Sequence, residues 1–200
     1  QKEVIRRAGI DATLVEQVVG GCVTQAGAQG NNVTRGAWLA SGLPWQTACT
    51  TIDCQCSSAQ QANHFIANLI HAGAMDVGIA CGVESMSWIA LRAAVGNGEN
   101  GMPRPDDWAV DLPDQFTAAD RIAKRRGLSR ADLEELGVRS QANAQRAWDE
   151  GRFDRETFAV EAPERLKDGT YTGETVTVTR DQGLRETTAE ALAGLTPVLE

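Results

Sequence analysis

The chain has 200 residues, and its 19 Lys and Arg against 27 Asp and Glu give a net charge of −8. This length allows one domain or one and a half, and 42% hydrophobic with 23% charged residues excludes wholesale disorder and collagen-like or mucin-like sequences. The acidic balance argues against a nucleic-acid-binding protein, and the most apolar stretch, 65–83, is broken by polar residues and predicts no membrane span. We therefore expect a cytoplasmic protein.

The first part of the chain predicts alternating helices and strands. Residues 1–9 resemble the last turns of a helix that Gly9 ends, and because they begin without Met, we expect a fragment or further residues before them. Strands are expected at 17–23, 47–53 and 76–81, and helices at 31–39 and 57–72. Strand–helix–strand crossovers imply right-handed units, and so the predicted fold class is α/β with a layered, parallel sheet.

The second part of the chain predicts mostly helices. An irregular loop is expected at 93–112, helices at 115–126, 129–149 and 187–195, and a short strand at 176–179. Ser129 and Asp132 have the spacing of a capping box. We interpret the chain as two domains, an α/β core at 1–82 that carries the candidate nucleophile and an inserted domain at 83–200.

The cysteines predict reduced thiols rather than disulfides. There are five, an odd number, and most lie in or beside apolar, strand-like runs, which suits small buried core residues: Cys22, Cys49, Cys54, Cys56 and Cys81. Cys54 and Cys56 have the spacing of half a metal site, but no second Cys or His pair stands at ligand spacing. We therefore expect no metal.

The strongest local feature is Cys56, where a strand leads directly into a helix. Free N–H groups and the dipole at a helix N-terminus stabilise negative charge, which favours a nucleophilic thiolate. The small residues 57–59 would let a substrate approach, and the Cys56 N–H is a candidate oxyanion donor. From position alone, a buried structural cysteine at a helix start is an equally good interpretation.

A cysteine nucleophile needs a base, and the two histidines do not fit that role. His64 and His71 both lie on the helix that follows Cys56. Eight residues at about 1.5 Å rise put His64 roughly 12 Å along the helix axis from Cys56, beyond hydrogen-bond reach. A Cys–His pair must therefore be completed from outside these residues.

Phosphate-binding signals are weak. The glycines of 20–30 lack the spacing of a dinucleotide-binding loop. A basic cluster on the expected helices fits either a solvated helix face or attraction of a polyanion, and Arg180 with Arg185 fits either surface ion pairs or phosphate contacts. The cluster comprises Arg121, Lys124, Arg125, Arg126 and Arg130.

Several ordered segments resemble motifs of the thiolase family. Residues 52–59 are similar to its nucleophile segment V-N-x-x-C-x-S-G, and 80–87 to A-G-G-x-E-S-M-S. Residues 115–120 and 128–130 resemble M-G-x-T-A-E and I-S-R, and 180–188, followed by Leu192, Leu195 and Pro197, resemble D-E-x-x-R-x-x-T and L-x-x-L-x-P. The Cys-Gln-Cys variant resembles thiolases of actinobacterial lipid and sterol breakdown.

The resemblance implies an N-terminal thiolase half with an inserted loop domain. It implies that Cys56 is acylated by a 3-ketoacyl-CoA, which releases acetyl-CoA, and that the acyl group passes to CoA, or that the reverse Claisen condensation occurs. Coenzyme A is then a substrate, with no further cofactor, and a homodimer or homotetramer is expected. The residues implied to contact CoA are Gln115, Arg185, Glu186 and Thr187.

The sequence also departs from the family pattern. The G-H-P histidine, the C-x-G cysteine and the N-E-A-F segment of the family's second half are absent, and Asp53 and Ala59 replace the usual Asn and Gly. We therefore expect that these 200 residues alone do not turn over acetoacetyl-CoA. Two alternatives stay open: a non-catalytic CoA- or acyl-binding module, and a decarboxylating condensing enzyme. Residues 84–87 and 180–188 favour a thiolase over the latter.

Overall fold

The computed structural model describes residues 1–91, 93–98, 101, 103–166 and 168–199. The chain divides into two compact units, Gln1–Trp108 and Ala109–Glu200, and each is described by itself. The domain boundary predicted at 82/83 stays a prediction. None of the helices in the described residues is long and apolar enough to cross a membrane.

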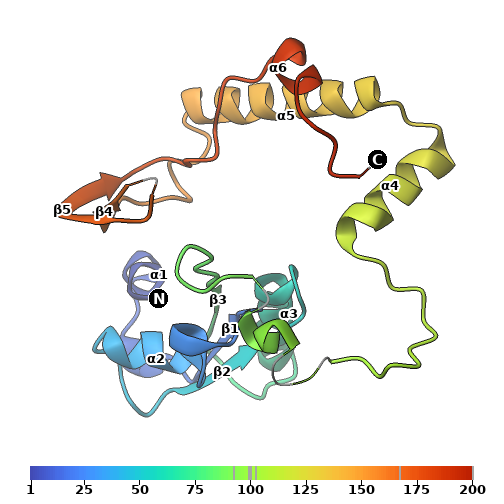
Figure 1. Ribbon diagram of the computed structural model, residues 1–200. Coiled ribbons are helices and arrows are strands. Elements are labelled where there is room, and N and C mark those ends of the chain that lie inside the picture. Colours follow the sequence, from blue (N-terminus) through green and yellow to red (C-terminus); the bar gives the residue numbers. More distant parts are fainter. Residues whose placement is uncertain (92, 99–100, 102, 167, 200) are drawn as a thin grey trace. The chain divides into compact units, whose positions relative to one another are not determined.

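The first unit is built on a three-stranded parallel sheet (Figure 1). Its strands are β1 (Gln17–Gly21), β2 (Ala48–Ile52) and β3 (Gly78–Gly82), in the order β2-β1-β3. Gln17 pairs in register with Ala48 on one side and with Gly78 on the other. Short 3₁₀ turns at Ala12–Leu14 and Gly27–Gln29 flank β1, and α2 (Val33–Ala40) and α3 (Ser58–His71) connect the strands. The predicted α/β fold with a parallel sheet is confirmed; the strand bounds differ from the predicted ones by one or two residues, and β3 ends one residue later than predicted.

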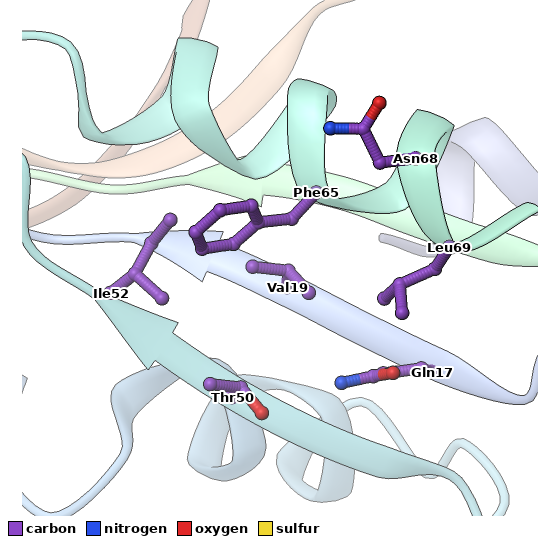
Figure 2. A pocket seen from close by; sticks show the side chains of 7 residues that line it. All are labelled: Gln17, Val19, Thr50, Ile52, Phe65, Asn68 and Leu69. Carbon is purple, nitrogen blue, oxygen red and sulfur yellow. The ribbon is translucent and has the colours of Figure 1, made fainter. Parts of the chain in front are cut away.

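Helix α3 covers one face of this sheet. Val19 of the central strand points to that face and packs with Ala62, Ile66 and Met75, all buried. At the β2 side of α3 a pocket opens above the sheet (Figure 2). Its lining is mostly apolar and consists of Gln17, Val19, Thr50, Ile52, Phe65, Asn68 and Leu69.

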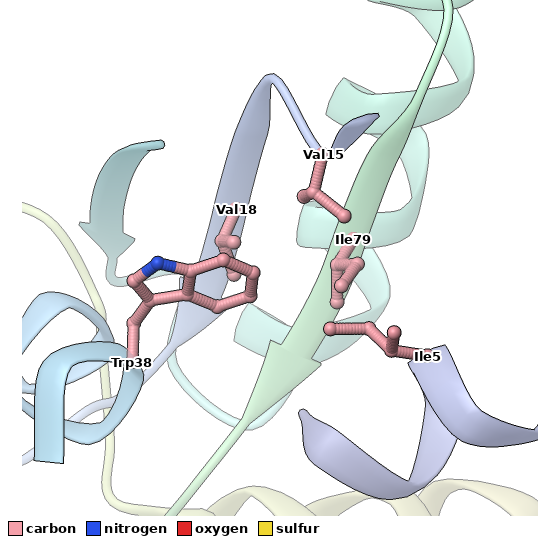
Figure 3. Close-up of a cluster of buried hydrophobic side chains, with 5 residues drawn as sticks. All are labelled: Ile5, Val15, Val18, Trp38 and Ile79. Carbon is pink, nitrogen blue, oxygen red and sulfur yellow. The ribbon is translucent and has the colours of Figure 1, made fainter. Parts of the chain in front are cut away.

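Helices α1 (Lys2–Ala8) and α2 cover the other face. Val18 points the opposite way from Val19, because successive side chains of a strand alternate between the two faces. It is fully buried among Ile5, Val15, Trp38 and Ile79 (Figure 3). A central strand that packs on both faces explains why the sequence of β1 is apolar without alternation.

The helix ends of the first unit follow the predicted signals. Helix α1 ends at Gly9, whose φ of 66° lies in the left-handed region that glycine adopts without strain. Asn32 caps α2, since its side chain accepts a hydrogen bond from the Arg35 N–H at 3.3 Å. The same side chain donates to the Cys49 carbonyl at 2.9 Å and so joins α2 to β2.

The second unit contains three helices and a hairpin among its described residues. Helices α4 (Gln115–Arg126), α5 (Arg130–Asp149) and α6 (Ala189–Ala193) match the predicted ones, although α6 is shorter. The capping box of Ser129 and Asp132 is present at the start of α5. The loop expected at 93–112 contains a 3₁₀ turn at Ala93–Gly98, which belongs to the first unit, and its residues 99, 100 and 102 lie outside the described residues.

The β-hairpin of the second unit corrects a prediction. Only a short strand at 176–179 was expected, but β4 (Val160–Arg165) and β5 (Tyr171–Val178) pair antiparallel, with Val160 opposite Val178. The sequence of β4 does not predict a strand because it contains charged residues and Pro163. An edge strand nevertheless tolerates proline. The turn signal was Asp168-Gly169: Gly169 has a φ of 93°, and the Asp168 side chain accepts from the Thr170 N–H at 2.9 Å.

Candidate active site

Cys56 lies on a tight turn between the end of β2 and the start of α3. The Ser57 N–H donates to the Cys54 carbonyl at 3.2 Å, and the Ser58 N–H donates to the Gln55 carbonyl at 3.0 Å. Gln55 has a φ of 52°, which residues with a side chain rarely adopt. Cys54 and Cys56 are both exposed residues. The interpretation of Cys56 as a buried structural cysteine is therefore wrong.

The Ser58 side chain stabilises this turn through two hydrogen bonds to its backbone. Ser58 is buried, with 4% of its surface exposed. Its Oγ donates to the Gln55 carbonyl at 2.6 Å and accepts from the Cys54 N–H at 2.9 Å. The Asp53 side chain accepts from the Gln55 N–H at 2.7 Å. Hydrogen bonds from both sides therefore hold the backbone that carries Cys56.

Two glycines let the first turn of α3 approach the sheet. A Cβ added at Gly21, the last residue of β1, would lie 2.4 Å from the Ala59 nitrogen. A Cβ at Gly82, the last residue of β3, would lie 2.8 Å from the Ala59 Cβ. The methyl group of Ala59, where the thiolase motif has Gly, is therefore accommodated by Gly82 on the facing strand.

Glu84, two residues beyond β3, holds the loop that follows β1. Its carboxylate accepts from the Val23 N–H at 2.8 Å, from the Thr24 N–H at 3.2 Å and from the Gln29 side chain at 3.1 Å. The Gln29 side chain in turn accepts from the Ser85 N–H at 2.5 Å. Glu84 therefore ties together the loops that leave the carboxyl ends of two neighbouring strands.

These contacts change the titration of Glu84. Burial is the largest single influence and favours the protonated form, but the hydrogen bonds from Val23, Thr24 and Gln29 together outweigh it. The pKa of Glu84 is therefore lowered from its ordinary 4.5. A lowered pKa in the folded state contributes stability above the unfolded value, and this contribution is lost as the pH falls through the folded value.

The substitution Glu84→Gln tests this linkage. We expect it to lower the free energy of unfolding at neutral pH by about 1–3 kcal/mol, because a charged acceptor of several N–H groups is lost. The difference from wild type should begin to shrink below about pH 4.5, where the carboxyl of the unfolded chain protonates, and should be lost as the pH falls through the lower pKa of the folded state. Urea unfolding from about pH 3 to about pH 7 measures it. A difference that stays constant over this range would contradict the linkage.

The other cysteines differ from the pair on the turn. Cys22 is buried, and burial, followed by the charge of Glu84, raises the pKa of its thiol. Burial also raises the pKa of Cys49 on β2. Cys49 and Cys81 are half-buried. The expectation of buried thiols thus holds for Cys22 and is wrong for Cys54 and Cys56.

The histidines lie on α3, as the sequence predicts. The His64 ring contacts the side chains of Gln60 at 3.0 Å and Gln61 at 3.4 Å, both on its own helix. His71 is the last residue of α3. Within the parts of the chain that the structure covers, no group of three or more His, Cys, Asp or Glu side chains is placed to hold a metal ion.

The residues expected to contact CoA all belong to the second unit, whereas Cys56 belongs to the first. Gln115 is exposed at the first position of α4. Arg185 and Glu186 are exposed and Thr187 is half-buried; the Arg185 N–H donates to the Gln141 side chain of α5 at 3.3 Å. Their role toward CoA stays a prediction.

Several basic residues of the second unit are engaged in structural pairs. Arg121 pairs with Asp111 at 2.7 Å and Lys124 with Asp120 at 2.7 Å. The Arg130 guanidinium pairs with Glu134 and donates to main-chain carbonyls at the end of α6. Arg180 lies 3.7 Å from Asp149 and over the Trp148 ring. These contacts favour the interpretation of a solvated, ion-paired surface.

Comparison with known proteins gives the family. The model of the thiolase N-terminal domain matches residues 1–200. The chain belongs to the thiolase family. It is 34% identical to the steroid 3-ketoacyl-CoA thiolase FadA6 of Mycobacterium tuberculosis, with 98% of this chain and 48% of the relative aligned. It is 33% identical to the 3-ketoacyl-CoA thiolase of Bacillus subtilis, with 98% of this chain and 50% of the relative aligned.

A solved thiolase structure confirms the fold. The crystal structure of the Bacillus anthracis acetyl-CoA acetyltransferase superposes with a TM-score of 0.76 at 26% identity, over 98% of this thiolase chain and 50% of that one. The chain therefore spans about half the length of these relatives and has the α/β fold of the N-terminal thiolase half. The predicted family and fold class are both confirmed.

Sequence reasoning missed the residues of this thiolase that support Cys56. Ser58 was noted only for its small size, and Glu84 only as part of a motif. The glycines at the ends of β1 and β3 are visible in the sequence, whereas the left-handed conformation of Gln55 is not. The role of these residues depends on which strands are neighbours in the sheet, and the sequence does not give that order.

Proposed function

We propose that the protein is an acyl-CoA acyltransferase in which Cys56 carries the acyl group. The proposed substrate is a 3-ketoacyl-CoA, which is cleaved to acetyl-CoA and a shortened acyl-CoA, or is formed in the reverse Claisen condensation. The names of two relatives support this substrate class: one is a steroid 3-ketoacyl-CoA thiolase and the other a 3-ketoacyl-CoA thiolase.

The proposed reaction has two steps. The Cys56 thiolate attacks the 3-keto carbon of the substrate; the bond between C2 and C3 breaks, and the departing carbon takes a proton as acetyl-CoA leaves. The sulfur of free CoA, after losing its proton, then attacks the thioester carbon, and the bond from that carbon to Cys56 breaks. We propose that the acid that protonates the departing carbon and the base that takes the proton of CoA both come from outside these 200 residues, since His64 contacts Gln60 and Gln61 on its own helix.

The observation that carries this proposal is the exposed Cys56 on a rigid turn. Cys56 lies beyond the carboxyl end of β2 and two residues before the start of α3. Hydrogen bonds within the turn use the N–H groups of Gln55, Ser57 and Ser58. We propose the Cys56 N–H as the donor to the oxyanion, because a backbone donor fixed beside the nucleophile needs no reorganisation.

The binding of CoA is proposed for the second unit. Gln115 would lie near the pantetheine chain, and Arg185 with Glu186 and Thr187 near the nucleotide. The Gln141 side chain supports this by anchoring the Arg185 backbone to α5. We also propose that the protein forms a homodimer or homotetramer, as the thiolase resemblance implies.

A covalent-adduct experiment tests the role of Cys56. The intact mature protein is incubated with acetyl-CoA, quenched in acid and digested, and the peptides are analysed by mass spectrometry. We expect one acetyl group on the peptide that contains residues 54–57, and protection of Cys56 from iodoacetamide by acetyl-CoA. The variant Cys56→Ala should carry no adduct there, because the acceptor sulfur is gone.

Cys54→Ser is the matched control, because it lies on the same exposed turn but is not the proposed nucleophile. It should retain the adduct on Cys56. An adduct that moves to Cys54, or an intact protein with no adduct at all, would overturn the assignment.

A further inference from the structure

We propose that Cys54 and Cys56 form a reversible disulfide when the protein meets a hydroperoxide, so that the turn before α3 is an oxidative modification site. This inference goes beyond acyl transfer, since it concerns the pair of thiols and requires no CoA. Only the sulfur of Cys56 is shared with the proposed reaction.

Exposure is the first observation that carries the inference. Cys54 and Cys56 are the two exposed cysteines of the five, while Cys22 is buried and the others are half-buried. Oxidation by peroxide follows thiolate character and access from solvent. Burial raises the pKa of Cys22 and of Cys49, which reduces the thiolate fraction of both. Peroxide should therefore react first at the turn.

The geometry of the turn is the second observation. The bond from the Ser57 N–H to the Cys54 carbonyl closes a β-turn, with Gln55 at a φ of 52° inside it. Consecutive Cα atoms are about 3.8 Å apart, so a turned tripeptide holds its first and third Cα roughly 5 to 7 Å apart. This range overlaps the roughly 4.4–6.8 Å that disulfides require.

The backbone of the pair is fixed as well. Both main-chain polar groups of Cys54 are used, since its N–H donates to Ser58 Oγ and its carbonyl accepts from Ser57. These hydrogen bonds hold the Cα atoms of Cys54 and Cys56 at the separation that the turn sets. An exposed bridge of this kind belongs to the labile class that small thiols reduce.

The chemistry balances with hydrogen peroxide as the oxidant. The Cys56 thiolate attacks one peroxide oxygen; a sulfur–oxygen bond forms, the oxygen–oxygen bond breaks and hydroxide leaves, which gives a sulfenic acid. The Cys54 sulfur then attacks the Cys56 sulfur; the disulfide forms, the sulfur–oxygen bond breaks, and the departing hydroxide takes the Cys54 proton as water. Two thiols lose two electrons in total, and the peroxide gains them.

Without Cys54 the same oxidation should continue. A sulfenic acid that finds no thiol is oxidised further to sulfinic acid, which dithiothreitol does not reduce. Cys54 therefore protects Cys56 from irreversible damage. On the proposed function, the disulfide would also block acylation until it is reduced.

Thiol mapping tests the inference. The protein is treated with hydrogen peroxide, its remaining thiols are blocked with N-ethylmaleimide, and its peptides are weighed with and without dithiothreitol. In wild type, the peptide with Cys54 and Cys56 should lose two hydrogen atoms, stay unlabelled, and regain both thiols on reduction. In Cys54→Ser, Cys56 should become sulfinic acid and its labelling should be lost permanently. Cys49→Ser, outside the turn, should behave like wild type.

Three outcomes would overturn the inference. These are an unchanged pair of thiols in wild type, a bridge from Cys56 to Cys22 or to another molecule, and full recovery of Cys56 in Cys54→Ser. Because thiol masses do not depend on CoA chemistry, these outcomes leave the acetyl-adduct test of the proposed function untouched. Failure of the acetyl-adduct test would likewise not contradict the proposed disulfide.

Discussion

Gly21→Ala is expected to lower the free energy of unfolding by about 3 kcal/mol, at the upper end of the usual cost of overpacking. The added Cβ would lie 2.4 Å from the Ala59 nitrogen and from the Ser58 carbonyl carbon, both of them backbone atoms. Neither can move without displacing the first turn of α3. We therefore also expect the rate of Cys56 labelling by iodoacetamide to change. Urea denaturation and the labelling time course measure the two effects.

Gly36→Ala provides the matched control for this substitution. Gly36 lies within α2, and an added Cβ there has no atom within 4 Å. Ala in a helix interior is favoured over Gly by about 0.5–1 kcal/mol, so this variant should be slightly more stable than wild type. If Gly21→Ala were as stable as Gly36→Ala, close packing of α3 on β1 would be excluded.

Trp38→Ala should destabilise the first unit by about 3–5 kcal/mol, the usual cost of removing a large buried aromatic side chain. Trp38 is 0% exposed and belongs to the buried cluster shown in Figure 3, where it lies beside Val18. Its indole N–H also donates to the Pro44 carbonyl at 2.6 Å, and this carbonyl would lose its partner. The urea midpoint, followed by circular dichroism, measures the loss.

Trp45→Ala separates burial from residue type. Trp45 is 71% exposed, and its described contact with Arg35 uses the backbone carbonyl, which the substitution keeps. We expect a change within about 0.5 kcal/mol. Equal destabilisation by the two tryptophan variants would contradict the assignment of Trp38 to the core.

Local signals explain the parts of the fold that the sequence predicts correctly. The ends of α1 and α5 depend on Gly9 and on the pair Ser129 and Asp132, each a pattern within a few residues. The parallel sheet follows from apolar strands separated by helices. The placement of Cys56 between β2 and α3 follows in the same way, because β2 is rich in β-branched and small residues and α3 has helical periodicity.

Long-range contacts explain what the sequence does not predict. Val23 and Glu84 are 61 residues apart, and their bond exists because β3 pairs with β1. The close approach at Gly21 depends on the packing of α3 over the same strand. Strand β4 becomes a strand only through its pairing with β5, against the local preference of Pro163. No local pattern specifies these partners.

The left-handed conformation of Gln55 limits which amino acids can precede Cys56, the proposed nucleophile. Gly, Asn or Asp would occupy this position with little strain, whereas Val, Ile or Thr would be forced into an outlying conformation. A branched side chain there would push the turn into another shape and carry the Cys56 sulfur with it. The position of this thiol is therefore sensitive to the backbone conformation of the residue before it.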